Sequence, residues 1–238
     1  MSIDNRSVVG KARSRPPRAR FAKGFANSGG GKSVGLTPRS VHGPTQALKR
    51  SLDVFVASLA LICLAPLLLF AAFAIKLDDR GPIIFRQRRV GQSGKRFVIY
   101  KFRTMSVAED GQWVEQARQC DPRVTRVGRL LRQSSIDELP QFLNVLRGDM
   151  SIVGPRPHAV AHDEYYRAMI SNYALRARVK PGISGWAQVH GLRGGTEAIE
   201  EMQARVQMDN WYIDNWSLWL DVKILWKTCV EVASFRAY

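Results

Sequence analysis

Acidic residues are scarce in this chain of 238 residues. Asp and Glu number 20 against 36 Lys and Arg, which gives a formal net charge of +16. The imbalance is strongest in residues 1–50, where 11 Lys or Arg accompany a single acid, Asp4. A basic arm of this kind predicts a negatively charged partner, either nucleic acid or anionic lipid.

Cysteine is rare as well. Cys63, Cys120 and Cys229 are far apart, odd in number and without paired spacing. This pattern argues against a disulfide framework and against a zinc site, and it fits a reducing compartment.

Residues 1–46 have little apolar periodicity and many helix breakers, so we expect a disordered basic tail. The fragment "GGGKS" imitates a phosphate-binding loop. The glycine required five positions before Gly31 is Ala26, however, and no apolar strand precedes it. We therefore reject this fragment as a nucleotide site.

One long apolar run stands out against this polar background. Val54–Ile75 contains 22 residues without a charge, enough to extend about 33 Å as a helix and cross a bilayer core. Pro66 lies just past its midpoint and predicts a kink. Basic residues flank both ends, so a bent, re-entrant helix over residues 47–78 would keep both ends on the cytoplasmic side. An ordinary kinked spanning helix and a buried core helix are the alternatives.

For residues 79–238 we predict one domain. Its fold class is α/β, of a mostly helical α+β kind. Ile83–Phe85 and Phe97–Tyr100 are β-rich and flank the turn "GQSGK", which indicates a small hairpin. We expect helices over 105–120, on both sides of "SSIDELPQ", and over 197–233, with loops at 151–159 and 180–191. Several helices are expected to be amphipathic and to lie in a membrane interface.

The stretch "SSIDELPQ", residues 134–141, contains the adjacent carboxylates Asp137 and Glu138. It reads as a capping box, with Ser135 as the cap and Glu138 reaching back. Pro140 disturbs a helix that begins at Ser135, which favours Asp137 as the cap instead. With Arg132 nearby, the same residues suit a phosphate site in which one carboxylate attacks phosphorus and the other holds Mg²⁺.

From about residue 48 onward, the chain resembles the bacterial sugar transferases, the monotopic polyprenol-phosphate phosphoglycosyl transferases. The matching stretches are "KRSLDVFVASLALICLAPL", "IFRQRRVGQSGKRFVIYKFRTM", "DPRVTRVGRLLRQSSIDELPQFLNVLRGDMSIVGPRP", "RVKPGISGWAQVHGLRG" and "MDNWYIDNWSLWLDVKIL". They cover roughly four-fifths of the chain, in order. His190 departs from the pattern, since asparagine is common at that position.

The resemblance implies transfer of a sugar 1-phosphate from a UDP-sugar to undecaprenyl phosphate, with release of UMP. The sugar would be glucose, with galactose as the main competitor, and the step would begin exopolysaccharide, capsule or O-antigen assembly. By matching positions, Asp137 would be the nucleophile that forms an aspartyl-phosphosugar intermediate, Glu138 the Mg²⁺ ligand and Arg132 a phosphate contact. Further positions that match as substrate-binding residues are Arg89, Lys101, Arg103, Arg156, Arg176, Arg178, Lys180 and Asp209.

The resemblance also implies residence in the bacterial inner membrane, with the catalytic domain on the cytoplasmic face and anionic lipids around it. Homo-oligomers or polysaccharide assembly proteins remain open as partners. Two other functions compete. A nucleic-acid binder would use the basic tail, but no binding module supports it, and we expect no nucleic-acid partner. A non-catalytic membrane-anchored scaffold would use Asp137 and Glu138 only as helix caps.

Overall fold

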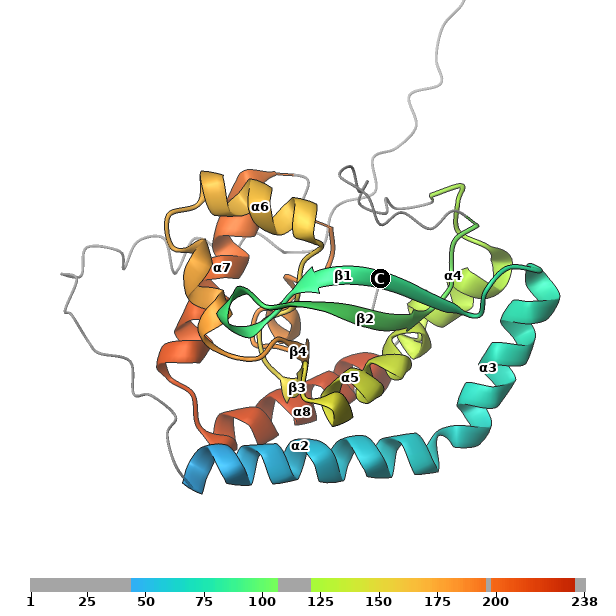
Figure 1. Ribbon diagram of the computed structural model, residues 1–238, viewed down its shortest axis with the longest axis horizontal. Coiled ribbons are helices and arrows are strands. Elements are labelled where there is room, and N and C mark those ends of the chain that lie inside the picture. Colours follow the sequence, from blue (N-terminus) through green and yellow to red (C-terminus); the bar gives the residue numbers. More distant parts are fainter. Residues whose placement is uncertain (1–43, 107–120, 196–197, 234–238) are drawn as a thin grey trace, which may run out of the picture. The chain divides into compact units, whose positions relative to one another are not determined.

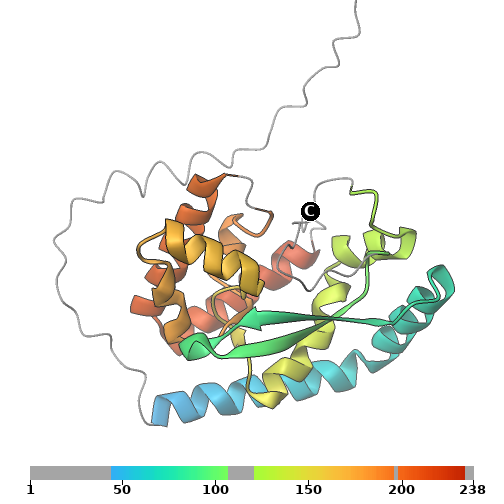
Figure 2. The same cartoon turned by 45° about the horizontal axis from the view of Figure 1, so that its top comes forward.

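The computed structural model describes residues 44–106, 121–195 and 198–233, all of which fall within the unit Thr37–Tyr238. Residues 1–43 of the predicted tail and most of the helix expected over 105–120 therefore lie outside the described residues, whereas residues 44–46, predicted as the end of the disordered tail, are helical. Within these ranges the fold is mostly helical, with two small two-stranded sheets. Figures 1 and 2 show the described elements from two directions.

The long apolar run forms two helices, α2 (Pro44–Cys63) and α3 (Ala65–Asp78), which meet at a bend of 62°. Pro66 stands in the first turn of α3, where its missing N–H costs no hydrogen bond within α3. In the described chain, neither helix alone has the length and hydropathy of a membrane span, whereas the bent pair together has both. Figure 1 shows α2 running below the hairpin and α3 rising from the end of α2 toward the start of the hairpin.

The predicted hairpin is present. Strands β1 (Ile84–Val90) and β2 (Arg96–Phe102) pair antiparallel, joined by the short 3₁₀ turn η1 (Gln92–Gly94). Ser93 and Gly94 both adopt positive φ in this turn, which reverses the chain within a few residues. Alternate side chains of β2, Phe97 and Ile99, are buried, so one face of the hairpin packs on the main core.

Four elements follow the hairpin around the acidic stretch. They are α4 (Arg126–Gln133), the 3₁₀ helix η2 (Ile136–Gln141), α5 (Phe142–Arg147) and the strand β3 (Ser151–Val153). Thr125 caps α4 by accepting a hydrogen bond from the Gly128 N–H at 3.0 Å. The element η2 packs against β2, and this contact fixes where the acidic pair lies.

The remaining elements form the C-terminal part of the described chain: α6 (Val160–Met169), η3 (Tyr173–Arg178), β4 (Gly182–Ser184), η4 (Gln188–His190), α7 (Ile199–Asp214) and α8 (Leu218–Ala233). Strand β4 pairs parallel with β3, where we predicted loops. A Cβ on Gly182 would approach the Gly154 nitrogen to 2.1 Å, so only glycine permits this close pairing.

Polar groups anchor α2 to the rest of the fold. The buried Asp53 accepts hydrogen bonds from the Ser151 hydroxyl at 3.0 Å and the Ile152 N–H at 2.9 Å. Lys49 donates to Asp221 of α8 at 2.5 Å, and the Tyr212 hydroxyl donates to the same carboxylate at 2.7 Å. The N-terminal half of the bent helix pair is therefore fastened to the strand β3 and to α8.

Candidate active site

Glu138 is the centre of a cluster of cations. Its side chain is only 9% exposed. The Lys101 ammonium, from β2, donates to Oε1 of Glu138 at 2.8 Å. The Arg156 guanidinium, from the loop after β3, donates to Oε1 at 2.5 Å and to Oε2 at 3.3 Å, the forked geometry typical of arginine on a carboxylate.

A third cation, Arg193, was not predicted. It lies in the segment that follows η4, and its Nη2 donates to Oε2 of Glu138 at 3.3 Å and to the Ser135 hydroxyl at 2.9 Å. One feature of the sequence could have identified Arg193: in "GLRGG" it stands among glycines, which allow the backbone to approach another segment closely. Arg205 of α7 holds the same segment by donating to the Gly194 carbonyl at 2.5 Å.

The neighbouring Asp137 is half-buried and electrostatically different from Glu138. Burial, and next the charge of Glu138, together raise the pKa of Asp137 to about 6, against the opposing effect of Lys101 and Arg132. Burial would also raise the pKa of Glu138, but Arg156 and Lys101 outweigh it and hold that pKa well below its ordinary value. Two adjacent carboxylates are thus tuned apart, as acid–base and nucleophilic sites require.

The capping box expected at Ser135 does not form. Ser135 adopts a left-handed conformation with φ of 59° and makes no side-chain cap hydrogen bond. Its hydroxyl accepts from Arg193 instead. The 3₁₀ helix begins at Ile136, so Asp137 is not the cap either. Because capping does not account for the two carboxylates, their burial among cations needs another explanation.

Arg89 and Arg132 also lie near this cluster. Arg89, on β1, donates to the Pro157 carbonyl at 3.0 Å, one residue from Arg156, and its charge contributes to lowering the pKa of Lys101. Arg132 is near the end of α4, and its charge lowers the pKa of Asp137. Four of the predicted basic residues therefore surround the acidic pair: Arg89, Lys101, Arg132 and Arg156.

Arg176 and Asp209 form a buried ion pair rather than part of the open site. Nε of Arg176 donates to Asp209 at 2.8 Å, and the two side chains are 7% and 3% exposed. Arg176 also donates to the Arg156 carbonyl at 2.5 Å. Its contact with the site is thus indirect, through the backbone that carries Arg156.

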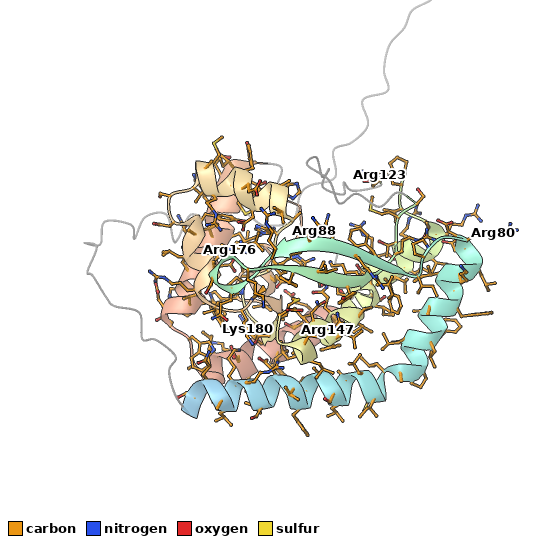
Figure 3. The ribbon with its side chains drawn as sticks, in the orientation of Figure 1. Arg80, Arg88, Arg123, Arg147, Arg176 and Lys180 are labelled. Carbon is orange, nitrogen blue, oxygen red and sulfur yellow. The ribbon has the colours of Figure 1, made fainter. Side chains whose placement is uncertain are left out.

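Arg103, Arg178 and Lys180 lie elsewhere. Arg103 is buried and pairs with Asp79 at 3.1 Å, just after the end of α3. Arg178 is exposed, and its carbonyl accepts from Gln92 in the hairpin turn. Burial lowers the pKa of Lys180, and so does the charge of Arg50, a residue of α2 whose side chain lies near the end of α5. Figure 3 labels Arg176 and Lys180 and shows the side chains around the hairpin.

The donor set can be compared with what a divalent metal needs. In the described chain, no cluster of three or more His, Cys, Asp or Glu side chains could hold a metal by itself. Mg²⁺ does not need one, because it binds through one or two carboxylates, waters and substrate phosphates. Oε2 of Glu138 has two contacts, both at 3.3 Å and thus longer than those of Oε1, so it is the oxygen of this carboxylate that could hold a cation. The residues present therefore fit Mg²⁺ once a diphosphate brings in negative charge.

Comparison with known proteins shows the family of this chain. Residues 44–235 match the family described as bacterial sugar transferase, and the chain belongs to that family. It is 60% identical over 180 residues to the UDP-glucose:undecaprenyl-phosphate glucose-1-phosphate transferase of Caulobacter vibrioides, covering 76% of this chain and 67% of the relative. It is 54% identical over 195 residues to the Escherichia coli K12 protein of the same name, covering 82% and 42%.

A more distant relative is named for a different sugar. The UDP-N-acetylgalactosamine-undecaprenyl-phosphate N-acetylgalactosaminephosphotransferase of Aeromonas hydrophila is 44% identical over 181 residues, covering 76% of this chain and 42% of the relative. The chain thus spans less than half the length of the Escherichia coli and Aeromonas proteins. Family membership extends across relatives that are named for more than one sugar.

Proposed function

We propose that this protein transfers a sugar 1-phosphate from a UDP-sugar to undecaprenyl phosphate and releases UMP, as the first membrane step of a bacterial surface polysaccharide. The observation that carries the proposal is the pairing of Asp137, whose pKa lies near neutrality, with Glu138, which three cations hold ionised. The names of the two most similar relatives described above favour glucose as the sugar.

In the first half-reaction, a carboxylate oxygen of Asp137 attacks the β-phosphorus of the UDP-sugar. A bond forms between that oxygen and phosphorus, while the bond from phosphorus to the bridging oxygen breaks. The electron pair leaves with UMP. Asp137 must be ionised to attack, and a pKa of about 6 leaves most of it ionised at neutral pH while keeping it more basic than an ordinary aspartate.

In the second half-reaction, a phosphate oxygen of undecaprenyl phosphate attacks the same phosphorus. The new diphosphate bond forms as the bond to Asp137 breaks, which regenerates the carboxylate and completes a ping-pong cycle. Lys101, Arg156 and Arg193, which gather around Glu138, would stabilise the charge that develops on the diphosphate oxygens.

Glu138 is the residue that would hold Mg²⁺, through Oε2, together with phosphate oxygens of the donor. When bound, the ion supplies charge neutralisation at the diphosphate. Arg156 keeps Oε1 of Glu138 in place through its short contact of 2.5 Å, so the carboxylate stays oriented while Oε2 changes partner. Arg176 donates to the carbonyl of Arg156, and Arg89 donates to the carbonyl of the next residue, Pro157. Both contacts hold the backbone that carries Arg156 and so orient this arginine.

We further propose that the protein is a monotopic enzyme of the inner membrane, with its catalytic part on the cytoplasmic face. Large apolar side chains are exposed along α2 and α3, for example Phe55, Ile62, Leu69 and Phe70, each at least 65% exposed. Exposed apolar surface of this size marks an interaction site, and with basic residues at both ends of the bent pair a re-entrant membrane helix accounts for it. Anionic lipids would then face the flanking cations.

The reaction is tested with purified full-length protein, Mg²⁺ and a panel of UDP-sugars, with UMP as the readout. Wild type should release one equivalent of UMP without acceptor and turn over when undecaprenyl phosphate is added. Asp137→Asn should release none, and Glu138→Gln should release it much more slowly, while thermal unfolding shows both variants folded. Arg96→Ala removes an exposed charge elsewhere and serves as the control. Normal UMP release by Asp137→Asn would refute the proposed chemistry and leave the scaffold function.

A further inference from the structure

The helix α8 exposes an apolar face bordered by two lysines. Trp219, Val222, Trp226 and Val230 are 51–76% exposed and follow one another at helical spacing. Tryptophan favours the interface between lipid headgroups and hydrocarbon. Lys223 follows Trp219 by four residues and Lys227 follows Lys223 by four. Both lysines therefore leave the helix along the same side of the apolar face, at its border.

The two lysines converge on one aromatic side chain. Nζ of Lys227 lies 5.3 Å from the centroid of Trp186, and Nζ of Lys223 lies 6.0 Å from it. Trp186 stacks on Trp211 with ring centroids 4.9 Å apart and contacts His190 at 4.0 Å. The indole is thus fixed by its neighbours and has two positive charges within 6.0 Å of its centroid.

His190 fixes the direction of Lys227. Nδ1 of His190 lies 2.8 Å from the Trp186 carbonyl oxygen, which can only accept, so Nδ1 carries the proton. Nε2 is then an acceptor and receives a hydrogen bond from Nζ of Lys227 at 3.2 Å. Burial lowers the pKa of His190, in keeping with a neutral ring. The Lys227 ammonium is therefore turned toward the protein at η4.

Charged residues relate this side of α8 to the acidic pair. Burial raises the pKa of Glu231, one turn after Lys227, and the charges of Arg193 and Lys227 both oppose this rise, so Glu231 lies within electrostatic range of both. Arg193 in turn donates to Glu138 and Ser135. Electrostatic range thus relates Lys227 to Arg193 through Glu231, and Arg193 contacts Glu138 of the proposed site directly.

We infer that Lys223 and Lys227, on the Trp186–His190 platform, form the site at which the phosphate of undecaprenyl phosphate is received from the membrane. This inference rests on the proposed function, since it assigns the acceptor of that reaction to a place. A terminal phosphate monoester carries about −1.5 to −2 charges at neutral pH, whereas the phosphodiester of a bulk lipid carries one. Two ammonium groups around one indole suit the monoester better, and its chain would lie along the exposed Trp and Val side chains.

The two half-reactions separate this site from the donor site. Full-length protein in phosphatidylcholine nanodiscs is mixed rapidly with UDP-sugar and Mg²⁺, and the UMP burst is measured without acceptor. Undecaprenyl phosphate is then varied to obtain its KM. For Lys227→Ala, we expect an unchanged burst and a KM raised about tenfold, as for the loss of one charge-assisted hydrogen bond. Lys223→Ala/Lys227→Ala should raise it further, and Lys227→Arg should restore most of it.

Lys95→Ala is the matched control, because it removes the same charge from the exposed hairpin turn and should leave both half-reactions unchanged. An unchanged KM in Lys227→Ala would overturn the inference, and so would a burst slowed as much as the second step. Adding phosphatidylglycerol tests bulk lipid: if it competes in wild type and abolishes the difference between wild type and Lys227→Ala, the site binds phosphodiesters and the inference is wrong. Absence of any UMP burst in wild type would instead refute the proposed transferase reaction.

Discussion

Arg193 and Glu138, 55 residues apart in the chain, meet at 3.3 Å between Nη2 and Oε2. The same nitrogen donates to the Ser135 hydroxyl at 2.9 Å, and Ser135 is the left-handed residue that begins the acidic turn. One guanidinium therefore joins the segment after η4 to both ends of the stretch that holds Asp137. This contact orients the acidic pair from outside the elements that carry it.

Arg193→Ala should lower kcat/KM for the UDP-sugar at least about tenfold, because a charge-assisted contact to a buried carboxylate and the tether on Ser135 are both lost. Arg193→Lys retains the charge but not the reach of the guanidinium, so its loss should be intermediate. Initial rates of UMP release measure both. Arg96→Ala, which breaks an exposed ion pair with Glu164, should behave as wild type. Wild-type kinetics in Arg193→Ala would show that the contact has no role in catalysis.

The pH dependence should report Asp137. Because its pKa is about 6 and the ionised form attacks, kcat/KM for UMP release should fall about tenfold per pH unit below pH 6. Arg132 lowers this pKa, so Arg132→Gln should move the midpoint upward. A pH profile flat down to pH 5 in wild type would exclude Asp137 as the group that titrates.

Unfolding does not explain such a loss. The folded-state pKa of Asp137 lies above the unfolded value, so its contribution to stability is fully present below about pH 3.8 and is lost as pH rises through 6. Glu138 has the opposite shift, and its contribution is lost only as pH falls through its lowered pKa. Thermal unfolding at pH 5 and pH 7 should therefore show a folded protein at both values.

Local patterns predicted the parts of the fold that depend on near neighbours. The hairpin followed from β-rich residues around "GQSGK". The apolar run bends as well, but the break falls at Leu64, two residues before Pro66, at which the kink was predicted. Strands β3 and β4 were missed because three residues are too few to show an alternating pattern. Their pairing depends on close backbone approach at Gly154 and Gly182, which becomes visible only when both segments are placed.

The candidate site was predicted only in part, because some of its contacts are local in the sequence and others depend on tertiary structure. Asp137 and Glu138 stand out because acids are scarce, and the pattern around them is local. Whether a distant basic residue reaches them depends on tertiary structure. Lys101 and Arg156 reach Glu138, whereas Arg103 pairs with Asp79 and Arg176 with Asp209. Sequence alone gives the charge of each residue but not its burial or its partner.

The Arg176–Asp209 pair should matter for stability. Arg176→Ala leaves Asp209 buried without its partner, and we expect the free energy of unfolding to fall by about 3–5 kcal/mol. Chemical denaturation measures it. Arg178→Ala, two residues further on and exposed, should change stability by less than about 0.5 kcal/mol. Equal effects of the two substitutions would contradict a structural role for the buried pair.

The re-entrant geometry predicts that both ends of the bent helix pair are reached from the same side of the membrane. Gln46 and Arg80 are exposed just inside the start of α2 and just after α3, so they suit single-cysteine labelling better than Lys49, which is bound to Asp221. With Cys63, Cys120 and Cys229 replaced, Gln46→Cys and Arg80→Cys should both react with an impermeant maleimide in inside-out vesicles. Neither should react in intact cells.

The bend itself can be tested by restoring the backbone N–H that Pro66 lacks. Pro66→Leu allows one continuous helix, and the charge-free run could then extend about 33 Å, so a fraction of molecules should span the bilayer and expose one end on the outside. Pro82→Leu, outside the helices, is the matched proline control and should leave labelling unchanged. Labelling of the two ends from opposite sides in the otherwise unmodified protein would show a spanning helix, because a re-entrant pair cannot present its ends to both compartments.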